Sequence, residues 1–290
     1  MRIVKVIGGL GNQMFQYALS VALKAHFPEE RVLLDLRCFR GYPKHFGFEL
    51  PAIFAIDYAE ASWRDVARVA YPYPNFQTWR FGSRLLPLRK SMLLEKKTFD
   101  MEPTALTSSG DTYYDGYWQH EEYFRDIRPQ ILDVFRFPDF TDEQNMQAAT
   151  RIAQTNSVSI HVRRGDYLTD PLFRGTGTLD YYAAAIRRMK ELTTPELFVV
   201  FSNDIAWTQQ NLAPVIGNCD ILYADWNTGR QSFNDIHLMS LCRHNIIANS
   251  SFSWWGAWLN TNQEKQVIAP AYWMNVEGTT SPAADSWIKV

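Results

Sequence analysis

Short apolar runs alternate with helical patterns along the second half of this chain. Five runs of four to six residues, rich in β-branched and aromatic side chains, predict buried strands. These runs cover residues 157–162, 197–201, 220–223, 245–248 and 266–269. Apolar residues recur at helical spacing over residues 179–192, and further helices are predicted up to Leu241, capped by Asn234 or Asp235, and after residues 249–251. Strands that alternate with helices predict a parallel sheet.

The chain opens with a pattern of the same kind. An apolar strand over residues 3–7 leads into a loop with three glycines, and a helical pattern follows over residues 14–26. A second strand over residues 31–35 completes a Rossmann-like strand–helix–strand opening. The third glycine of a dinucleotide fingerprint is missing near Met14, so a nicotinamide oxidoreductase is disfavoured.

The middle of the chain is less regular. Residues 36–110 mix proline, aromatic and basic residues, which is typical of loops and short helices, and we expect this variable stretch to face an acceptor. Residues 112–119 predict a strand followed by a turn. Residues 121–135 predict a helix that is interrupted at Pro129.

These patterns predict an α/β protein with two domains. A polar helix near residues 143–153 separates the irregular stretch from the regular second half. We therefore expect a Rossmann-like, acceptor-side domain over residues 1–154 and a second, ligand-binding domain over residues 155–290.

Composition narrows the function classes. The 290 residues are 46% hydrophobic and carry a formal net charge of -2. A chain with this charge does not attract nucleic acid electrostatically. Neither an opening signal peptide nor a long apolar run is readable, which predicts a soluble, intracellular protein. The three cysteines are isolated and predict neither a disulfide framework nor a metal site. The ten tryptophans are expected mostly in the core, although a non-catalytic glycan-binding protein would use them for sugar stacking.

The strand over residues 157–162 ends in unusual chemistry. Arg163 and Arg164 follow it directly, and Gly165 and Asp166 come next. Ligands of open α/β sheets bind outside the carboxyl ends of strands, and guanidinium groups there suit a phosphate ester. The alternative is an exposed basic turn with a salt bridge to Asp166.

Polar residues follow other strands of the second half. Ser250 and Ser251 stand where a strand passes into a helix, whose free N–H groups and dipole favour an anion. An ordinary helix cap is the alternative. Ser202 and Asn203 end the neighbouring strand and join the candidate nucleotide-binding residues. No Asp-x-Asp occurs, so arginine and helix dipole, rather than Mg²⁺, would have to neutralise a diphosphate.

These motifs resemble those of a known enzyme family. The sequence His-Val-Arg-Arg-Gly-Asp at residues 161–166 resembles the signature of α-1,2- and α-1,6-fucosyltransferases. Residues 8–18 and 249–255 resemble the first and last blocks of the α-1,2 group, glycosyltransferase family 11. The three blocks occur in order, and the resemblance spans residues 1 to about 260.

The resemblance implies a GT-B-like architecture, with two Rossmann-like domains whose parallel sheets face a central cleft. It implies a galactoside α-1,2-fucosyltransferase that takes GDP-β-L-fucose as donor and inverts the anomeric centre. It implies a β-galactoside acceptor in a surface glycan, and no metal or other cofactor. Lactose, other disaccharides and O-antigen repeats are not distinguished as acceptors.

The resemblance also assigns roles to the donor-binding residues. Arg163 would hold the β-phosphate of the donor and neutralise the leaving GDP, with Arg164 in support. His161 would contact the nucleotide or the fucose. The diphosphate and ribose would be lined by Ser250, Ser251 and Phe252.

Further roles carried over by the resemblance concern the base and the first domain. Asp235 would accept hydrogen bonds from the guanine N1–H and 2-amino groups, with the helix cap as its alternative. Asn12 and Gln13 would close over the donor from the first domain. A general base is expected at Asp166, or else at Asp170, unless the reaction uses none.

Three rival functions remain open at this point. One is transfer from another sugar nucleotide such as GDP-mannose, the second is glycan binding without catalysis, and the third is the disfavoured oxidoreductase. The resemblance is to bacterial cytoplasmic members of the family. An acceptor carried on a lipid would bring such an enzyme to the inner face of a membrane as a peripheral protein.

Overall fold

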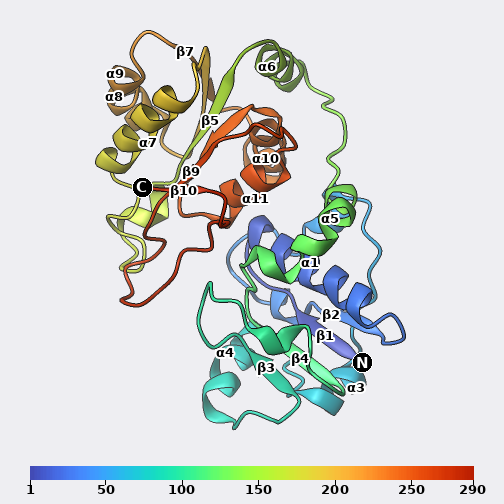
Figure 1. Cartoon of the computed structure of the whole chain (residues 1–290). Coiled ribbons are helices and arrows are strands. Elements are labelled where there is room, and N and C mark those ends of the chain that lie inside the picture. The colour runs from blue at the N-terminus through green and yellow to red at the C-terminus, as the bar shows by residue number, and fades with distance from the viewer. The chain divides into compact units, whose positions relative to one another are not determined.

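The chain folds into two compact units. The computed structural model describes the backbone of residues 1–290 and every side chain except that of Asp166. The first unit comprises Met1–Pro138 and the second Asp139–Val290 (Figure 1). Each unit contains one parallel β-sheet with helices packed on it.

The division between the units falls earlier than the predicted boundary after residue 154. Helix α6 (Glu143–Gln154) belongs to the second unit, because Ala148 and Ile152 are buried among apolar residues of the second sheet. The sequence pattern identified this helix correctly. It did not reveal which sheet the helix covers.

The first unit is built on a four-stranded parallel sheet in the order β2-β1-β4-β3. Its strands are β1 (Arg2–Lys5), β2 (Val32–Asp35), β3 (Met92–Leu94) and β4 (Thr112–Asp115). Its helices are α1 (Leu10–His26), α2 (Leu50–Ile53), α3 (Trp63–Val69), α4 (Phe76–Leu85) and α5 (Arg128–Val134). The predicted strand–helix–strand opening is therefore confirmed as β1, α1 and β2.

One predicted helix of the first unit is wrong in length. Residues 121–127 form two short 3-10 turns, and α5 begins only at Arg128. Pro129 lies in the first turn of α5 rather than at an interruption, since a proline needs no N–H partner there.

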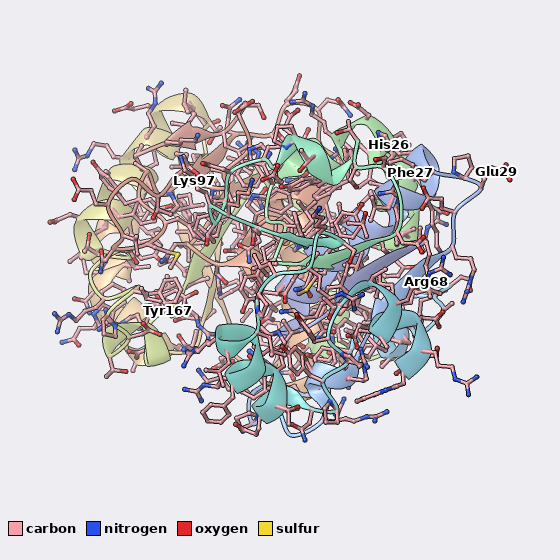
Figure 2. All side chains as sticks on the ribbon, turned by 90° about the horizontal axis from the view of Figure 1, so that it is seen from below. His26, Phe27, Glu29, Arg68, Lys97 and Tyr167 are labelled. Atoms are coloured by element: carbon pink, nitrogen blue, oxygen red, sulfur yellow. The ribbon has the colours of Figure 1, made fainter. Side chains whose placement is uncertain are left out.

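Helix α1 is the main helix of the first unit. Met14, Phe15 and Leu19 on its buried side are completely inaccessible to solvent. The helix ends at His26, and Phe27 and Glu29 lie in the turn that follows (Figure 2). The glycine loop therefore leads into a helix that is packed on the sheet over most of its length.

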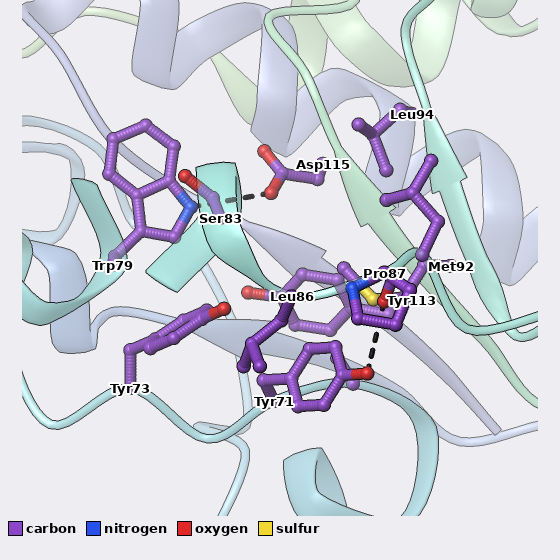
Figure 3. A pocket seen from close by; sticks show the side chains of 12 residues that line it. Tyr71, Tyr73, Trp79, Ser83, Leu86, Pro87, Met92, Leu94, Tyr113 and Asp115 are labelled. Carbon is purple, nitrogen blue, oxygen red and sulfur yellow. Dashed lines mark hydrogen bonds between the residues drawn. The ribbon is translucent and has the colours of Figure 1, made fainter. Parts of the chain in front are cut away.

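Helix α4 lies against strand β4 through Trp79. The indole Nε1 donates a hydrogen bond to Asp115 Oδ2 at 3.4 Å, and Lys5 Nζ lies 3.8 Å from the centroid of the indole ring. A cavity of about 20 Å³ remains beneath the helix, between Tyr73 and Tyr113 (Figure 3). That volume holds roughly one water molecule and is far too small for a sugar ring.

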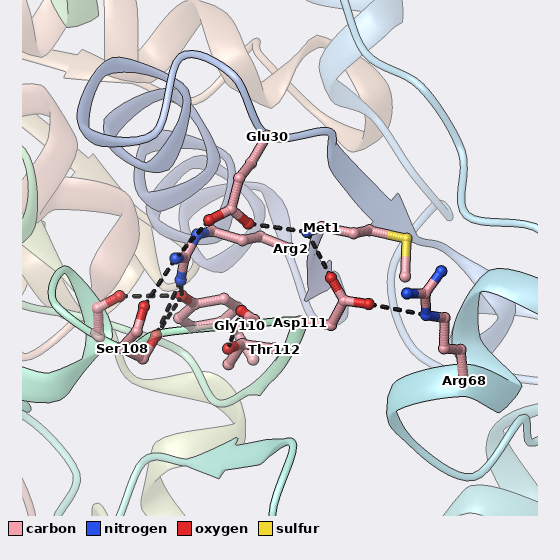
Figure 4. Close-up of polar contacts among 10 residues, drawn as sticks. Met1, Arg2, Glu30, Arg68, Ser108, Gly110, Asp111 and Thr112 are labelled. Atoms are coloured by element: carbon pink, nitrogen blue, oxygen red, sulfur yellow. Dashed lines mark hydrogen bonds and ion pairs between the residues drawn. The ribbon is translucent and has the colours of Figure 1, made fainter.

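A buried arginine joins the strands of the first sheet at their amino ends. Arg2 is inaccessible to solvent, and its guanidinium donates to the Tyr114 hydroxyl at 2.6 Å, to Glu30 Oε1 at 3.0 Å and to Ser108 (Figure 4). Its Cζ also lies 3.3 Å from the centroid of the Phe27 ring. Such a paired, hydrogen-bonded charge is tolerated inside a protein, whereas the loss of one partner would be costly.

The second unit has a six-stranded parallel sheet in the order β10-β9-β8-β5-β6-β7. Its strands are β5 (Ser157–Val162), β6 (Leu197–Ser202), β7 (Asp220–Ala224), β8 (His244–Ile246), β9 (Val267–Ala269) and β10 (Ile288–Lys289). Besides α6, its helices are α7 (Leu179–Leu192), α8 (Ile205–Asn211), α9 (Ala213–Ile216), α10 (Phe233–Leu241) and α11 (Ser251–Leu259). The five strands expected from the apolar runs are all present.

Strand β6 shows why this sheet reads as continuous apolar runs. Phe198 and Val200 pack on the face covered by α7 and α9, whereas Leu197, Val199 and Phe201 pack on the opposite face with α6 and α10. Successive side chains of a strand point to opposite faces, so a sheet covered on both faces needs apolar residues at every position.

Most tryptophans serve the core, as expected from the sequence. Six of the ten are buried, and three of these, Trp254, Trp255 and Trp258, pack together on α11 with ring centroids 5.0–6.0 Å apart. All three cysteines are free. Among the described residues, no helix combines the length and the apolar character that crossing a bilayer requires.

Candidate active site

The second sheet has a topological switch point beside strand β5. From β5 the chain continues to β6 and β7 on one side, and it then returns to β8 on the other side. Parallel α/β sheets bind ligands outside the carboxyl ends of the two strands that flank such a point. The loop after β5 and the start of α11, which follows β8, therefore flank the expected ligand position.

Direct contacts join these two segments. The Tyr167 hydroxyl, from the loop after β5, donates to the backbone oxygen of Asn249 at 3.2 Å. The rings of His161, in β5, and Phe252, in α11, lie 5.7 Å apart. The structure thus brings the arginine-rich strand end and the serine-rich helix start to one corner of the sheet.

Arg163 lies above an aromatic platform at this corner. Its Cζ is 5.5 Å from the centroid of the Tyr167 ring, and that ring stacks on Phe173 with 4.4 Å between centroids. The side chain is half-buried. A guanidinium that is partly desolvated beside a helix start is well suited to pair with a phosphate.

Arg164 is held by the protein itself. Its backbone N–H donates to Asn203 Oδ1 at 3.0 Å, its Nε donates to Asp204 Oδ2 at 3.3 Å, and its Cζ lies 4.0 Å from the Trp207 ring centroid. The ion pair that the structure shows is therefore with Asp204. The predicted alternative, a pair with Asp166, concerns a side chain outside the described part of the structure.

Gly165 allows two strand ends to approach each other closely. Its φ is +23°, and a Cβ at this position would lie 2.2 Å from Asn203 Nδ2. Ser202 Oγ accepts a hydrogen bond from the Asp204 N–H at 2.9 Å. Ser202 and Asn203, both expected to bind nucleotide, thus shape the arginine loop, and contact with a ligand stays a prediction.

His161 is buried at the end of β5. Burial, and to a smaller degree the charge of Arg163, lowers the pKa of His161 to about 3. Its imidazole is therefore neutral near pH 7 and supplies no positive charge. Its Nδ1 is buried and has no hydrogen-bond partner among the residues that the structure describes. An unpaired buried polar atom is uncommon, and a bound ligand at the site is one physical explanation for it.

Helix α11 begins as the sequence predicts. Ser250 occupies the N-cap, and its Oγ accepts a hydrogen bond from the Phe252 N–H at 3.3 Å. Ser251 is the first helical residue. The predicted cap is thus confirmed, and the positive end of the helix dipole lies at the corner that contains Arg163.

The predicted cap of α10 is wrong. The helix begins at Phe233 with Ser232 before it, so Asn234 and Asp235 both lie within its first turn. Asp235 Oδ1 accepts a hydrogen bond from Asn227 Nδ2 at 2.8 Å. Burial raises the pKa of Asp235 to about 7, against the opposite effect of that hydrogen bond. A carboxylate that is so costly to ionise favours a ligand that donates hydrogen bonds to it.

A buried amide network orients Asp235. Asn145 of α6 is 1% exposed, and its Oδ1 accepts hydrogen bonds from Trp226 Nε1 and Asn227 Nδ2, both at 2.9 Å. Its Nδ2 donates to Asn227 Oδ1 at 2.8 Å. No sequence pattern indicated this network, because Asn145 lies in an ordinary polar helix and Asn227 in an irregular loop.

Gln13 and Asn12, the two candidate residues of the first unit, differ in burial and in hydrogen bonding. Gln13 is inaccessible to solvent, and its amide bonds Gly8 O at 2.9 Å, Gly47 O at 2.8 Å and the Glu49 N–H at 2.8 Å. Its side chain thus fastens the glycine loop to residues 47–49. Asn12 is less buried, and its Oδ1 accepts a hydrogen bond from Gln119 Nε2 at 2.8 Å.

The general-base assignments remain predictions. Asp170 Oδ1 accepts a hydrogen bond from the Leu172 N–H at 2.9 Å, so this carboxylate shapes its own turn. The backbone of Asp166 lies in a short 3-10 helix, Gly165–Leu168, and its side chain is outside the described part.

No metal site is apparent among the side chains that the structure describes. These side chains include no group of three or more His, Cys, Asp or Glu residues arranged to hold an ion. The expected metal-independence of the reaction stays a prediction.

Comparison with known proteins finds similarity over most of the chain. A family model described as glycosyl transferase family 11 matches residues 90–289. An α-1,2-colitosyltransferase of Escherichia coli is 32% identical, and the alignment covers 99% of this chain and 98% of that protein. Galactoside α-(1,2)-fucosyltransferase 2 of Mus musculus is 29% identical, over 88% of this chain and 67% of that protein.

One solved structure supports the fold class. A mutant of Arabidopsis thaliana FUT1 in complex with GDP matches with a TM-score of 0.51 at 12% identity, covering 99% of this chain and 74% of that chain. Together with the two parallel sheets, this match confirms the predicted GT-B-like class with two Rossmann-like halves.

Proposed function

We propose that this chain, which belongs to glycosyl transferase family 11, transfers L-fucose from GDP-β-L-fucose to the 2-hydroxyl of a terminal β-galactoside. The observation that carries the proposal is the corner beside the switch point of the second sheet, where residues on either side of Arg163 contact the start of α11. A leaving diphosphate needs positive charge close to its oxygens, and an arginine together with a helix N-terminus supplies that charge.

The proposed reaction is a single in-line displacement. The oxygen of the acceptor hydroxyl forms a bond to the anomeric carbon while the bond from that carbon to the β-phosphate oxygen breaks. The configuration inverts, GDP leaves with the electron pair, and the hydroxyl proton passes to a base or to water. Charge develops on the departing phosphate, so Arg163 would contribute most in the transition state.

The remaining second-unit residues would bind the nucleotide. Asp235 would receive the guanine N1–H and 2-amino hydrogens, which adenine does not offer together. Ser250 and Ser251 would contact the phosphates. His161, as a neutral imidazole, would form a hydrogen bond to the donor rather than act as a cationic catalyst.

A second candidate donor is GDP-colitose. The Escherichia coli colitosyltransferase aligns along nearly the whole of both chains at 32% identity. Colitose is L-fucose without its 3-hydroxyl, so the same diphosphate and guanine contacts would serve either donor. The two donors differ at one hydroxyl of the sugar, and discrimination would depend on whether the enzyme has a hydrogen-bond partner for it.

The experiment is a donor panel measured by GDP release in the presence of EDTA. GDP-fucose, GDP-colitose and GDP-mannose are each tested with and without a β-galactoside, and the product linkage is read by NMR. Acceptor-dependent release from GDP-fucose with a 1,2 linkage is the expected result. Release from GDP-colitose alone would replace the donor, and loss of activity in EDTA would overturn metal-independence.

Binding assays with GDP, the galactoside and a nicotinamide cofactor separate the rival classes. A glycan-binding protein would bind the galactoside but show no GDP affinity, and an oxidoreductase would bind a nicotinamide cofactor. Residence at the inner face of a membrane, with a lipid-carried acceptor, completes the proposal. Cell fractionation tests it: recovery with the membrane fraction is the expected result, and recovery only in the soluble fraction or outside the cell would contradict it.

A further inference from the structure

Helix α4 turns an apolar stripe towards solvent. Its inner side is occupied by Phe76 and Trp79, whose rings lie 5.7 Å apart, and Phe76 also packs on Tyr42 at 4.8 Å. On the opposite side, Phe81 is 63% exposed and Leu85 is 80% exposed. These two residues are four positions apart, so their side chains lie on the same face of the helix.

The apolar surface continues beyond the end of the helix. Leu86 is 43% exposed and Leu88 is 60% exposed. Together with Phe81 and Leu85, they place four large exposed apolar side chains within eight consecutive residues. A patch of this kind marks an interaction surface, whereas scattered exposed leucines would need no explanation.

Positive charge surrounds this patch. Residues 66–94 contain five arginines and lysines and no aspartate or glutamate, in a chain whose net charge is -2. Arg80 and Arg84 are exposed beside the apolar stripe. Arg89 is used internally, since its Nη1 donates to the backbone oxygens of Ala67 and Ala70 at 2.7 and 2.8 Å. It thereby anchors the end of the patch to the rest of the unit.

We propose that Arg80, Phe81, Arg84, Leu85, Leu86 and Leu88 form a docking surface for an anionic lipid bilayer, called here the α4 surface. An amphipathic helix with an apolar stripe and flanking arginines is suited to the headgroup boundary, where the stripe enters the acyl region and the guanidinium groups stay at the phosphates. The stripe distinguishes this surface from a nucleic-acid site, which needs charge alone.

A small ligand does not explain the surface. The cavity beneath α4 has room for about one water molecule (Figure 3). Leu86 and Leu88 contribute to its lining, whereas Phe81 and Leu85 do not. On the inner face of the helix, Trp79 already contacts Asp115 and Lys5. The exposed face is therefore free to meet a flat surface without any rearrangement of the sheet.

Vesicle flotation of the full chain tests the proposal. We expect binding to vesicles of phosphatidylcholine mixed with phosphatidylglycerol, and little binding to phosphatidylcholine alone. The double variant Phe81→Ser/Leu85→Ser should lose roughly tenfold or more in partition, because it removes the inserted apolar groups. Arg80→Gln/Arg84→Gln should lose a similar factor, and added salt should reproduce that loss.

Matched controls come from exposed residues outside α4. Leu192→Ser/Leu241→Ser changes two leucines that are 38% and 44% exposed, and Arg136→Gln/Arg188→Gln changes two exposed arginines. Both controls should bind vesicles like the unchanged protein. The α4 variants should keep their thermal unfolding temperature, since α4 contains no buried residue.

Several outcomes would overturn the inference. These are an absence of binding to anionic vesicles, equal binding to neutral ones, or equal losses in the control variants. A dimer in solution that Leu85→Ser dissociates, without lipid binding, would assign the surface to a second copy of the chain. The assay contains no sugar nucleotide, so its result is independent of whether the proposed transfer reaction is correct.

Discussion

The two units each contain a glycine-containing loop after a sheet strand, and the two loops are used in opposite ways. In the first unit, residues 8–13 are covered by their own neighbours: the His45 ring would lie 2.9 Å from a Cβ at Gly9, and Gln13 is bonded on both sides of its amide. In the second unit, the loop after β5 keeps Arg163 half-buried beside a helix start, with an unpaired His161 Nδ1 behind it.

The hydrogen bonds that a loop already makes decide whether it can bind a ligand. A polar group whose hydrogen bonds are all made within the protein has nothing to offer a ligand, whereas a buried group without a partner gains a bond when a ligand arrives. Equal strand–loop–helix topology therefore does not imply equal function. The internal hydrogen bonds of Gln13 favour a structural role for the first loop, and the second loop forms the candidate active site. Contact of Asn12 or Gln13 with the donor stays a prediction.

The substitution Arg163→Ala should have the largest effect on activity, and it tests the role assigned to the second loop. Transfer efficiency should fall by about 10²–10³-fold, because the departing diphosphate loses its main positive partner. The measurement is kcat/KM from GDP release. Arg243→Ala is the matched control, since Arg243 is exposed at the amino end of β8, and it should stay within about twofold. Comparable losses in both variants would contradict the assignment.

The opposite behaviour is expected for Gln13→Ala. Three hydrogen bonds of a buried amide are lost and their partners stay buried, so the free energy of unfolding should fall by about 2–4 kcal/mol. GDP affinity of the folded protein should not change. Denaturant unfolding and GDP titration provide the two readouts. A variant that stays stable but binds GDP poorly would place Gln13 in the donor site.

Gly165→Ala tests the close approach within the second loop. A Cβ at this position meets Asn203 Nδ2 at 2.2 Å, so the loop must shift, with an expected cost of about 1–3 kcal/mol in stability and reduced transfer. Adding Asn203→Ala removes the obstacle and should recover part of the loss. If the double variant is as impaired as Gly165→Ala alone, the clash is not the cause.

A change of pH should have a smaller effect, on the affinity for GDP. Because the pKa of Asp235 is raised to about 7, the carboxylate that would receive guanine is depleted in acid. GDP affinity should fall by about tenfold between pH 8 and pH 6, and Asp235→Asn should abolish this slope. Titration calorimetry at both pH values is the measurement. A flat profile in the unchanged protein would remove Asp235 from guanine recognition.

The same pKa shift has a consequence for stability, and its sign is opposite to that of binding. A carboxyl group whose pKa is higher in the folded state than its ordinary 3.8 stabilises the fold while protonated. That contribution is lost as pH rises through 7. The thermal unfolding temperature without GDP should therefore fall towards pH 8, and this dependence should weaken in Asp235→Asn.

The sequence predicted those parts of the fold that depend on local pattern. The strands of the second sheet and the cap at Ser250 follow from apolar runs and from the chemistry of helix starts. The domain boundary was placed on the wrong side of α6, because the pattern of an amphipathic helix does not indicate which sheet the helix covers. The prediction that Asn234 or Asp235 caps α10 was wrong, because polar residues are common both at the cap of a helix and in its first turn.

The site was predicted only where it lies within one motif. Arg163 and Gly165 are contiguous with a strong strand, so their placement was readable. Asp204, which pairs with Arg164, and Asn145, which orients Asn227 and Asp235, lie 40 or more positions from their partners. Such contacts depend on strand order and helix packing, which a single sequence does not state.

The most direct test of the central claim compares GDP with GMP as ligands. Both carry guanine, but only GDP has the β-phosphate that Arg163 is proposed to hold. Titration calorimetry of the unchanged protein and of Arg163→Ala should show a loss of about 10–100-fold for GDP and less than about twofold for GMP. An equal loss for both ligands, or unaltered GDP binding, would contradict a diphosphate site at the end of β5.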